Sequence, residues 1–355
     1  MEFSRVTIKD VAKRAGVAIG TVSRVINDRP GVDADLRARV EQAIRELNYR
    51  PNARARSFVQ NATPIISFIQ SNRKLVYPFH TDVLQNVEEA CAEEGYFVLF
   101  TRYNYSPETR PSELLLPNVL KSHGVADCLI LAGMNYENFL EAVENLGVPY
   151  VLLKNTYTGQ KPRPAVDQVG WDDHAGSYEA TKYLIDLGHR DIWYIGDTSL
   201  PWYRARFEGY RQAMRDHKLE PRGQTIGLSD NLYANGYACM EMILERGYPV
   251  TAVFAGYDDI AYGACDALTK HGLGTPRDVS VIGYHDEDHS QYKVPPLTTV
   301  RVDKLALGRQ LARMAIEKLR APGKRIPEVI LPVTLIRRGT TRPVAQELEV
   351  SEAAS

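Results

Sequence analysis

The first residues of the chain place their apolar side chains at helical spacing. Thr7 can cap a helix, and Gly16 permits the left-handed turn that would end it. The apolar residues between them recur at i, i+3, i+4 and i+7: Ile8, Val11, Ala12 and Ala15. We therefore expect a short amphipathic helix that turns sharply into the next element.

Two further helices are expected before residue 51. A helix over 19–27 would turn Val22 and Val25 toward the first helix. A third helix would begin after Asp33, which can cap it, and end before Pro51. Two short helices across a glycine turn, braced by a third, make a helix-turn-helix, whose second helix lies in the major groove of DNA.

From residue 64 onward, short apolar runs alternate with helical stretches. Continuous apolar strands separated by helices predict parallel sheets covered on both faces. The pattern occurs twice, which predicts two α/β lobes around a cleft, with ligand bound beyond the carboxyl ends of the strands. Segment 149–155 is expected to begin a crossing between the lobes, and final strands near 329–335 to cross back. The expected strands are 64–70, 96–104, 126–132, 149–155, 191–196, 225–228, 252–257 and 279–284, and the expected helices are 79–94, 112–123, 136–146, 203–217, 234–246 and 259–271.

Length and charge fit a small head on a larger body. A chain of 355 residues exceeds one ordinary core. Residues 1–60 carry twelve Lys or Arg against seven Asp or Glu, although the whole chain has a net charge of −1. A basic head on a mildly acidic body indicates a polyanion-binding module, although an ordinary solvated surface gives the same count.

Composition also narrows the compartment and the chemistry. No early apolar run has the shape of a secretory signal, and no stretch of ~18 apolar residues could span a bilayer, so we expect a cytoplasmic protein acting at the nucleoid. Four widely separated cysteines predict buried thiols rather than disulfides or a zinc site: Cys91, Cys128, Cys239 and Cys265. No cofactor is expected.

The head contains recognisable phrases. They are Thr7-Ile8-Lys9-Asp10-Val11-Ala12, Ala15-Gly16-Val17, Thr21-Val22-Ser23-Arg24-Val25-Ile26-Asn27 and Leu47-Asn48-Tyr49-Arg50-Pro51-Asn52. Over about fifty residues this resembles the headpiece of the LacI/GalR family of transcription regulators. The resemblance implies a DNA-binding repressor with a helix-turn-helix headpiece over 1–51.

The resemblance also implies individual contacts with DNA. Ile19, Gly20 and Arg24 fall where the family reads bases, and an arginine can donate a bidentate pair to guanine. Phosphate contacts or local caps are implied for Thr7, Thr21, Ser23 and Asn27. Two departures stand out, because Ala18 replaces the family's usual capping serine and Gly20 offers no side chain to a base.

Residues 52–62 match the family's hinge, which folds on DNA. Asn52 and Arg56 are expected to contact DNA there. Phe58 stands where the family inserts a leucine into the minor groove at the operator's centre, and an aromatic ring can also unstack a base step. The alternative is that Phe58 docks on the body.

The body resembles the family's periplasmic-binding-protein-like effector domain, which we expect over 63–343. The matching phrases are Asp172-Asp173-His174-Ala175-Gly176, Leu187-Gly188-His189-Arg190-Asp191-Ile192, Arg206-Phe207-Glu208-Gly209-Tyr210, Asp278-Val279-Ser280-Val281-Ile282-Gly283-Tyr284 and Pro295-Pro296-Leu297-Thr298-Thr299-Val300. Leu187-Gly188-His189 is interpreted as structural, a helix that ends at glycine before a buried strand. Effector contacts are implied for eight positions: Tyr77, Phe79, Lys154, Arg206, Tyr257, Asp258, His285 and Asp286.

Three of these positions depart from the sugar-responsive pattern. Lys154 stands where many members have an aspartate, His285 replaces another carboxylate, and Tyr257 replaces a frequent asparagine. Donors in place of acceptors favour an anionic effector, a sugar acid or sugar phosphate, with a neutral sugar as the alternative.

Other functional classes have less support. No Walker loop, nucleophile elbow or dinucleotide fingerprint appears, so an enzyme is not expected. A solute-binding protein without DNA function would share the body but lack the basic head. The tail 344–355 is short and acidic without leucine heptads, which favours a homodimer on a pseudo-palindromic operator over a tetramer.

Overall fold

The computed structural model describes residues 7–26, 30–47, 65–73, 78–121, 125–159, 162–225 and 231–344. The chain divides into two compact units, Met1–Thr63 and Pro64–Ser355. Each unit is described by itself.

The N-terminal unit is a three-helix head. Its helices are α1 (Ile8–Ala15), α2 (Ile19–Ile26) and α3 (Ala34–Glu46). The backbone N–H of Thr7, the residue before α1, donates to Asp10 Oδ2 at 2.8 Å, which is half of a capping box. Gly16 ends α1 with φ of 63°, a left-handed conformation that glycine adopts cheaply. These features confirm the helix-turn-helix predicted from the apolar spacing.

The head has its own small core. Three fully buried valines, one from each helix, hold the helices together: Val11, Val22 and Val40. Arg39 of α3 donates from Nη2 to the Ala15 carbonyl oxygen at 2.7 Å, which ties the third helix to the glycine turn.

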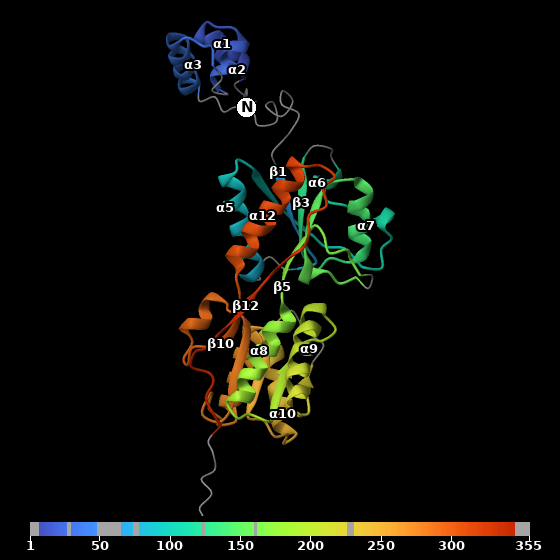
Figure 1. Cartoon of the computed structure of the whole chain (residues 1–355). Coiled ribbons are helices and arrows are strands. Elements are labelled where there is room, and N and C mark those ends of the chain that lie inside the picture. The colour runs from blue at the N-terminus through green and yellow to red at the C-terminus, as the bar shows by residue number, and fades with distance from the viewer. Residues whose placement is uncertain are drawn as a thin grey trace, which may run out of the picture. The chain divides into compact units, whose positions relative to one another are not determined.

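The larger unit consists of two α/β lobes (Figure 1). The sheet of lobe 1 is parallel throughout, with strand order β11-β5-β4-β3-β1-β2. Its strands are β1 (Ile65–Ser71), β2 (Phe97–Tyr103), β3 (Cys128–Gly133), β4 (Tyr150–Leu153), β5 (Gln168–Trp171) and β11 (Val329–Leu331). Its helices are α5 (Pro78–Glu93), the short α6 (Asn118–Lys121), α7 (Glu137–Leu146) and α12 (Lys304–Arg320).

Lobe 2 repeats the arrangement with one reversed edge strand. Its order is β12-β10-β9-β8-β6-β7, and β12 runs antiparallel to β10. The strands are β6 (Ile192–Ile195), β7 (Arg222–Gln224), β8 (Ala252–Ala255), β9 (Ser280–His285), β10 (Thr298–Val302) and β12 (Val333–Ile336). The helices are α8 (Asp173–Asp186), α9 (Pro201–Asp216), α10 (Leu232–Glu245) and α11 (Asp258–Lys270). The predicted two-lobed fold is therefore confirmed.

The chain passes between the lobes three times, from β5 to α8, from β10 to α12 and from β11 to β12. The expectation that 329–335 crosses over is confirmed. The expectation for 149–155 is wrong, because β4 stays in lobe 1 and the crossing follows Trp171. Apolar patterning gives both segments the same appearance, and only strand order separates them.

Two other expected elements differ from the structure. The helix predicted over 112–123 is interrupted: within the described residues a 3-10 turn at Pro111–Glu113 is followed by an irregular stretch, 114–117, and then by α6. The strand predicted at 225–228 lies earlier, as β7, and residues 226–228 are outside the described part of the chain. Three cysteines are buried as expected, whereas Cys265 is half-buried. Among the described residues, no helix is both long and apolar enough to cross a bilayer.

The Leu187-Gly188-His189 phrase is structural, as predicted. Helix α8 ends at Asp186, and Gly188 turns the chain with φ of 93°. His189 is buried, and its Nε2 lies 3.1 Å from the Arg342 carbonyl oxygen. Nε2 also lies 3.0 Å from Ser280 Oγ. Because a carbonyl only accepts and a hydroxyl can accept, a proton on Nε2 suits both neighbours, and the histidine fastens the C-terminal segment to lobe 2.

Candidate functional site

Helix α2 presents an uncovered face. Val22 and Val25 point into the head's core, whereas Ile19, Gly20 and Arg24 are exposed. Ile19 is 45% exposed, which is unusual for a large apolar side chain in so small a unit. A Cβ built on Gly20 would meet no atom within 4 Å, so the fold does not require glycine there. The three predicted base-reading positions therefore share one exposed face.

The predicted phosphate or capping positions are divided. Thr7 donates from Oγ1 to Asp10 Oδ2 at 2.7 Å, which favours a capping role in the unbound head. Thr21 and Ser23 are half-buried beside the exposed face. Four predicted DNA contacts, and the hinge that carries three of them, lie outside the described residues: Asn27, Asn52, Arg56 and Phe58.

The second candidate site is a cavity between the two lobes, lined from both sides. It lies at the carboxyl ends of the strands, where open α/β sheets bind ligands. Lobe 1 contributes residues after β1, at the N-terminus of α5, and at the ends of β3, β4 and β5. Lobe 2 contributes the N-termini of α9 and α10, together with residues after β8 and at the end of β9. Of the predicted effector residues, four line it: Phe79, Arg206, Tyr257 and His285.

Arg206 lies at the centre of a buried network. Its Nε donates to Asp173 Oδ1 at 2.7 Å, and both side chains are at most 2% exposed. Asp173, the first residue of α8 in lobe 2, also accepts from Trp171 Nε1 at 2.8 Å and Asn155 Nδ2 at 2.7 Å, two groups of lobe 1. One carboxylate thus holds the arginine and joins the lobes.

The other two nitrogens of Arg206 each donate one hydrogen bond as well. Nη1 donates to the Gly256 carbonyl oxygen at 2.5 Å, and Nη2 to His285 Nε2 at 2.9 Å. The guanidinium lies 3.9 Å from the ring centroid of Tyr284, a favourable cation–π distance. In this state Arg206 organises the cavity wall rather than pointing freely into the cavity.

Aromatic rings close the cavity. Phe79 lies 5.2 Å from Trp171 and 4.6 Å from His285, measured between ring centroids. Arg73 of lobe 1 lies 4.8 Å from the ring centroid of Trp202 of lobe 2. The cavity is partly open to the surface and its free volume is only about 60 Å³, room for a few water molecules. Ligand pockets usually exceed ~300 Å³, so a metabolite enters only if these contacts separate.

His285 sits on strained backbone. Its φ is 101°, and that of the next residue, Asp286, is 55°, both in the region that favours glycine. Burial, followed by the positive charge of Arg206, holds the pKa of His285 well below its usual value, so the ring is neutral. Burial likewise lowers the pKa of His80, a further lining residue, to about 3. Strained backbone of this kind tends to occur at functional sites, which supports a role for this part of the cavity wall in binding.

Three predicted effector residues do not line the cavity. Lys154 forms an ion pair with Glu328 at 2.9 Å. Asp258 is fully buried and accepts from Ser290 Oγ at 2.8 Å. Asp286 is held by Arg301 at 2.6 Å and by Arg338 at 2.7 Å. Each of the three is engaged by partners within the protein in this state, and its contact with an effector stays a prediction. Tyr77 lies outside the described residues.

Asp286 has a structural role beside the cavity. Arg301 is on β10 and Arg338 follows β12, so the carboxylate pins the turn after β9 to the strands beside it. This pinning stabilises the left-handed pair and fixes His285 in the cleft wall.

A second polar link joins the lobes beside the cavity. Lys304, at the start of α12 in lobe 1, pairs with Asp82 of α5 and lies 3.4 Å from Glu287 of lobe 2. Glu287 is 1% exposed and accepts from Tyr257 Oη at 2.6 Å. The chain of contacts therefore runs from a cavity-lining ring to helices α5 and α12.

Sequence reasoning missed several lining residues, among them Arg73, Asn155, Trp171 and Trp202. Each follows or ends a strand, or starts a helix, at the sheet edge where ligands bind, and that placement was the available signal. Trp171 was hidden because its strand was not recognised.

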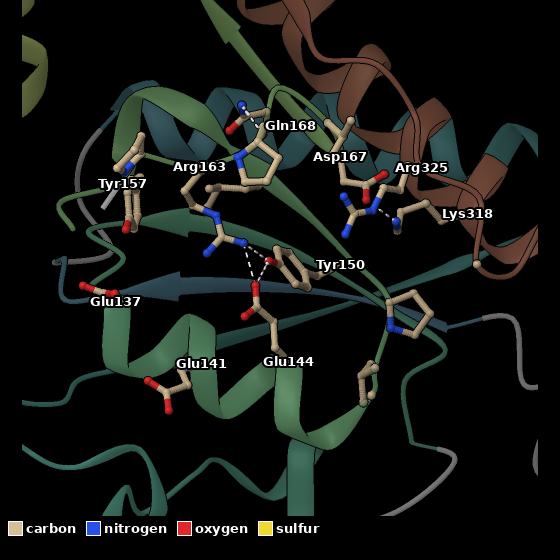
Figure 2. Close-up of a pocket in the computed structure, with 18 residues that line it drawn as sticks. Glu137, Glu141, Glu144, Tyr150, Tyr157, Arg163, Asp167, Gln168, Lys318 and Arg325 are labelled. Atoms are coloured by element: carbon tan, nitrogen blue, oxygen red, sulfur yellow. Dashed lines mark hydrogen bonds and ion pairs between the residues drawn. The ribbon is translucent and has the colours of Figure 1, made fainter. Parts of the chain in front are cut away.

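A larger groove lies on lobe 1 and is not the effector cleft. It measures about 740 Å³ and runs along α7 and the segment before β5 (Figure 2). Its charged side chains largely satisfy one another, as Arg163 does with Glu144 at 2.6 Å and Lys318 with Asp167 at 2.8 Å. Tyr150 adds a hydrogen bond to Glu144 at 2.7 Å. Cavity size alone would therefore have misplaced the site.

The described residues contain no group of three or more metal-ligating side chains placed to hold an ion.

Comparison with known proteins finds relatives for both parts of the chain. Residues 7–52 match the family model for bacterial regulatory proteins of the lacI family, and residues 181–341 match that for a periplasmic binding protein-like domain. The HTH-type transcriptional repressor PurR of Haemophilus influenzae is 35% identical over 317 residues, 88% of this chain and 91% of that protein. The PurR repressor of Histophilus somni is 34% identical, over 94% and 98% of the two chains.

Solved structures give the same picture. A lac repressor dimer bound to operator and the anti-inducer ONPF matches with a TM-score of 0.83 at 27% identity, over 96% of this chain and all of that one. A complex of the regulator CelR with cellobiose matches with a TM-score of 0.67 at 29% identity, over 95% and 100%. These relatives are transcriptional regulators, and the chain belongs to the LacI family of bacterial DNA-binding repressors.

Proposed function

We propose that this repressor binds a pseudo-palindromic operator as a homodimer and that a small molecule in the interlobe cavity controls its affinity for that operator. The observation that carries the DNA part is the exposed face of α2, where Ile19, Gly20 and Arg24 point away from the head's own core. A recognition helix needs such a face because its side chains must reach base edges. A symmetric pair of heads reads two half-sites.

The cavity supports an effector rich in hydrogen-bond acceptors. The described lining residues include two arginines, Arg73 and Arg206, and no aspartate or glutamate. This lining favours a carbohydrate-derived anion, such as a sugar acid or sugar phosphate. The aromatic rings of Phe79 and Trp202 also suit a neutral sugar face, which is the second candidate.

A change in how the two lobes are arranged would couple the effector cavity to DNA binding. Asp173 and Lys304 both join the lobes, so a ligand that parts or tightens the cleft shifts the balance between two lobe arrangements. Binding and operator affinity are then linked, with the sign set by which arrangement the ligand prefers.

The test selects DNA from a random pool and measures affinity for the selected palindrome by mobility shift at fixed salt. Arg24→Ala should weaken specific binding by roughly 5- to 150-fold, about 1–3 kcal/mol, with little change on unrelated DNA. Arg45→Ala, in the last turn of α3, is the matched control.

The effector arm uses thermal shift and operator affinity with gluconate, glucose 6-phosphate, ribose and cellobiose. Stabilisation by the anions with a change in operator affinity supports the first candidate. Stabilisation by the neutral sugars alone supports the second, and a chain that binds no duplex tightly in moderate salt contradicts the whole proposal.

A further inference from the structure

The ring of His285 has one engaged nitrogen and one without a partner. Nε2 lies 2.9 Å from Arg206 Nη2. A guanidinium has donors and no acceptor, so Nε2 must accept, and in a neutral ring the proton is then on Nδ1. Nδ1 is buried and meets no hydrogen-bond partner among the described residues, although the side chain is only 4% exposed and the ring lines the cavity. The protonation state of this ring is thus fixed by its neighbour.

We propose that His285 is a recognition group that only donates, through Nδ1–H, and that the effector presents an acceptor atom to it, a carboxylate or carbonyl oxygen. The inference rests on the proposed function and names the polarity of one contact within that site. It follows from two observations: Arg206 can only donate to Nε2, and Nδ1–H of this cavity-lining ring has no acceptor among the described residues.

An unsatisfied donor needs an acceptor because burial removes its water partners. Four aromatic rings surround the ring of His285, those of Phe79, Trp171, Tyr257 and Tyr284, at centroid distances of 4.6, 5.8, 4.8 and 5.5 Å. The hydroxyl of Tyr257 donates to Glu287, and none of the four side chains makes a hydrogen bond with Nδ1. A histidine whose Nε2 already accepts from Arg206 can only donate at Nδ1, so a ligand group that only donates is rejected.

The tautomer can be measured without knowing the effector. The full chain, labelled with ¹⁵N in its eight histidines, is examined by long-range ¹H–¹⁵N correlation at pH 7. His285 is identified by the loss of its signals in His285→Asn. We expect its proton on Nδ1, whereas the control His189 carries its proton on Nε2, because that nitrogen faces the Arg342 carbonyl. A proton on Nε2 of His285, or a doubly protonated ring, overturns the proposal.

The ligand preference is tested with acetate, a minimal carboxylate small enough for the closed cavity, and methylammonium, which only donates. Acetate should shift the Nδ1–H signal of His285 and leave the Nε2–H signal of His189 unchanged, and methylammonium at equal ionic strength should shift neither. No response to acetate, or an equal response to both probes, overturns the proposal.

Two variants separate polarity from shape. Asparagine can accept from Arg206 and still donate, so His285→Asn should keep acetate affinity within about threefold, read from tryptophan fluorescence near the cavity. His285→Leu should weaken it by about tenfold or more. Equal affinity in both variants contradicts the proposal, and the wild-type spectra decide it if the leucine variant fails to fold. None of these readouts involves DNA, so failure of this contact and failure of operator binding are distinguishable.

Discussion

Arg206 and Asp173 form an ion pair at 2.7 Å in which neither side chain is more than 2% exposed. A pair so deeply buried is organised by its surroundings, since Asp173 also accepts from Trp171 and Asn155 across the cleft. Breaking such a pair leaves a buried charge without compensation. The arginine predicted to hold the effector therefore also determines whether the cleft is built at all.

The first prediction concerns this pair. Arg206→Met should lower the free energy of unfolding by about 3–5 kcal/mol, because Asp173 would remain buried and charged. Urea denaturation measures the change. Arg204→Ala, on the same helix but exposed, should cost less than about 0.5 kcal/mol. If the two variants lose similar stability, the buried pair does not have the structural weight assigned to it.

The second prediction concerns Gly20. Open space around its Cβ position means that Gly20→Ala should stabilise the head by about 0.5–1 kcal/mol, through helix propensity. Gly16→Ala is the contrasting variant and should destabilise, because Gly16 has φ of 63° and its new Cβ would lie 2.9 Å from Arg39 Nη2. Hydrogen exchange of the core amides of the head reports both changes. A destabilised Gly20→Ala head would show that the exposed face of α2 is covered in solution.

The third prediction concerns the link between lobes. Lys304→Met removes the cation that Asp82 and the buried Glu287 share, so it should destabilise the larger unit by several kcal/mol. It should also increase exchange of amides lining the cleft. Lys324→Met, which breaks only an exposed pair with Glu317, should change stability by less than about 1 kcal/mol. If hydrogen exchange of the amides that line the cleft is unchanged in the Lys304 variant, then Lys304 does not hold the two lobes together.

The fourth prediction concerns pH. Burial, opposed by hydrogen bonds from Thr299, Glu287 and Ser290, raises the pKa of Asp258 to about 7. A carboxyl with a raised folded pKa binds more protons in the folded than in the unfolded state, so its contribution to stability is present at low pH. That contribution is lost as pH rises from about 4 toward 7.

Melting temperature between pH 5 and 8 provides the measurement. Asp258→Asn, which cannot ionise, should remove this part of the decline, and its curve should be flatter than that of the wild type. Parallel curves for the two proteins would mean that Asp258 is already ionised in the folded state across this range.

Much of the fold could be predicted from patterning. The stripe of Val11 and Ala15 and the turn at Gly16 defined the head, because a helix that buries one face must repeat its apolar residues every three or four positions. The apolar run that forms β1, Ile65–Ser71, predicted a central parallel strand, and its residues are buried almost throughout. The helix predicted at 112–123 is interrupted at 114–117, where Pro117 disfavours helical backbone at the residue before it.

The cleft was predicted in part. Phe79, Arg206, Tyr257 and His285 line it, whereas Lys154, Asp258 and Asp286 lie beside it with protein partners of their own. Position along a strand fixes which edge of the sheet a residue reaches. It does not determine whether the side chain there is already paired within the protein, as Lys154 is with Glu328 and Asp286 is with Arg301.

Local sequence is enough to specify the helical and strand periodicities, the glycine turn and the basic head, because these depend on neighbours within a few residues. The pairing of Arg206 with Asp173, and its donation to His285, depend instead on the folded chain, since these partners are 33 and 79 residues away in sequence. Hydrogen-bond polarity in the cleft is a property of such distant pairs. It becomes visible only once lobe 2 has folded and brought them within 3 Å.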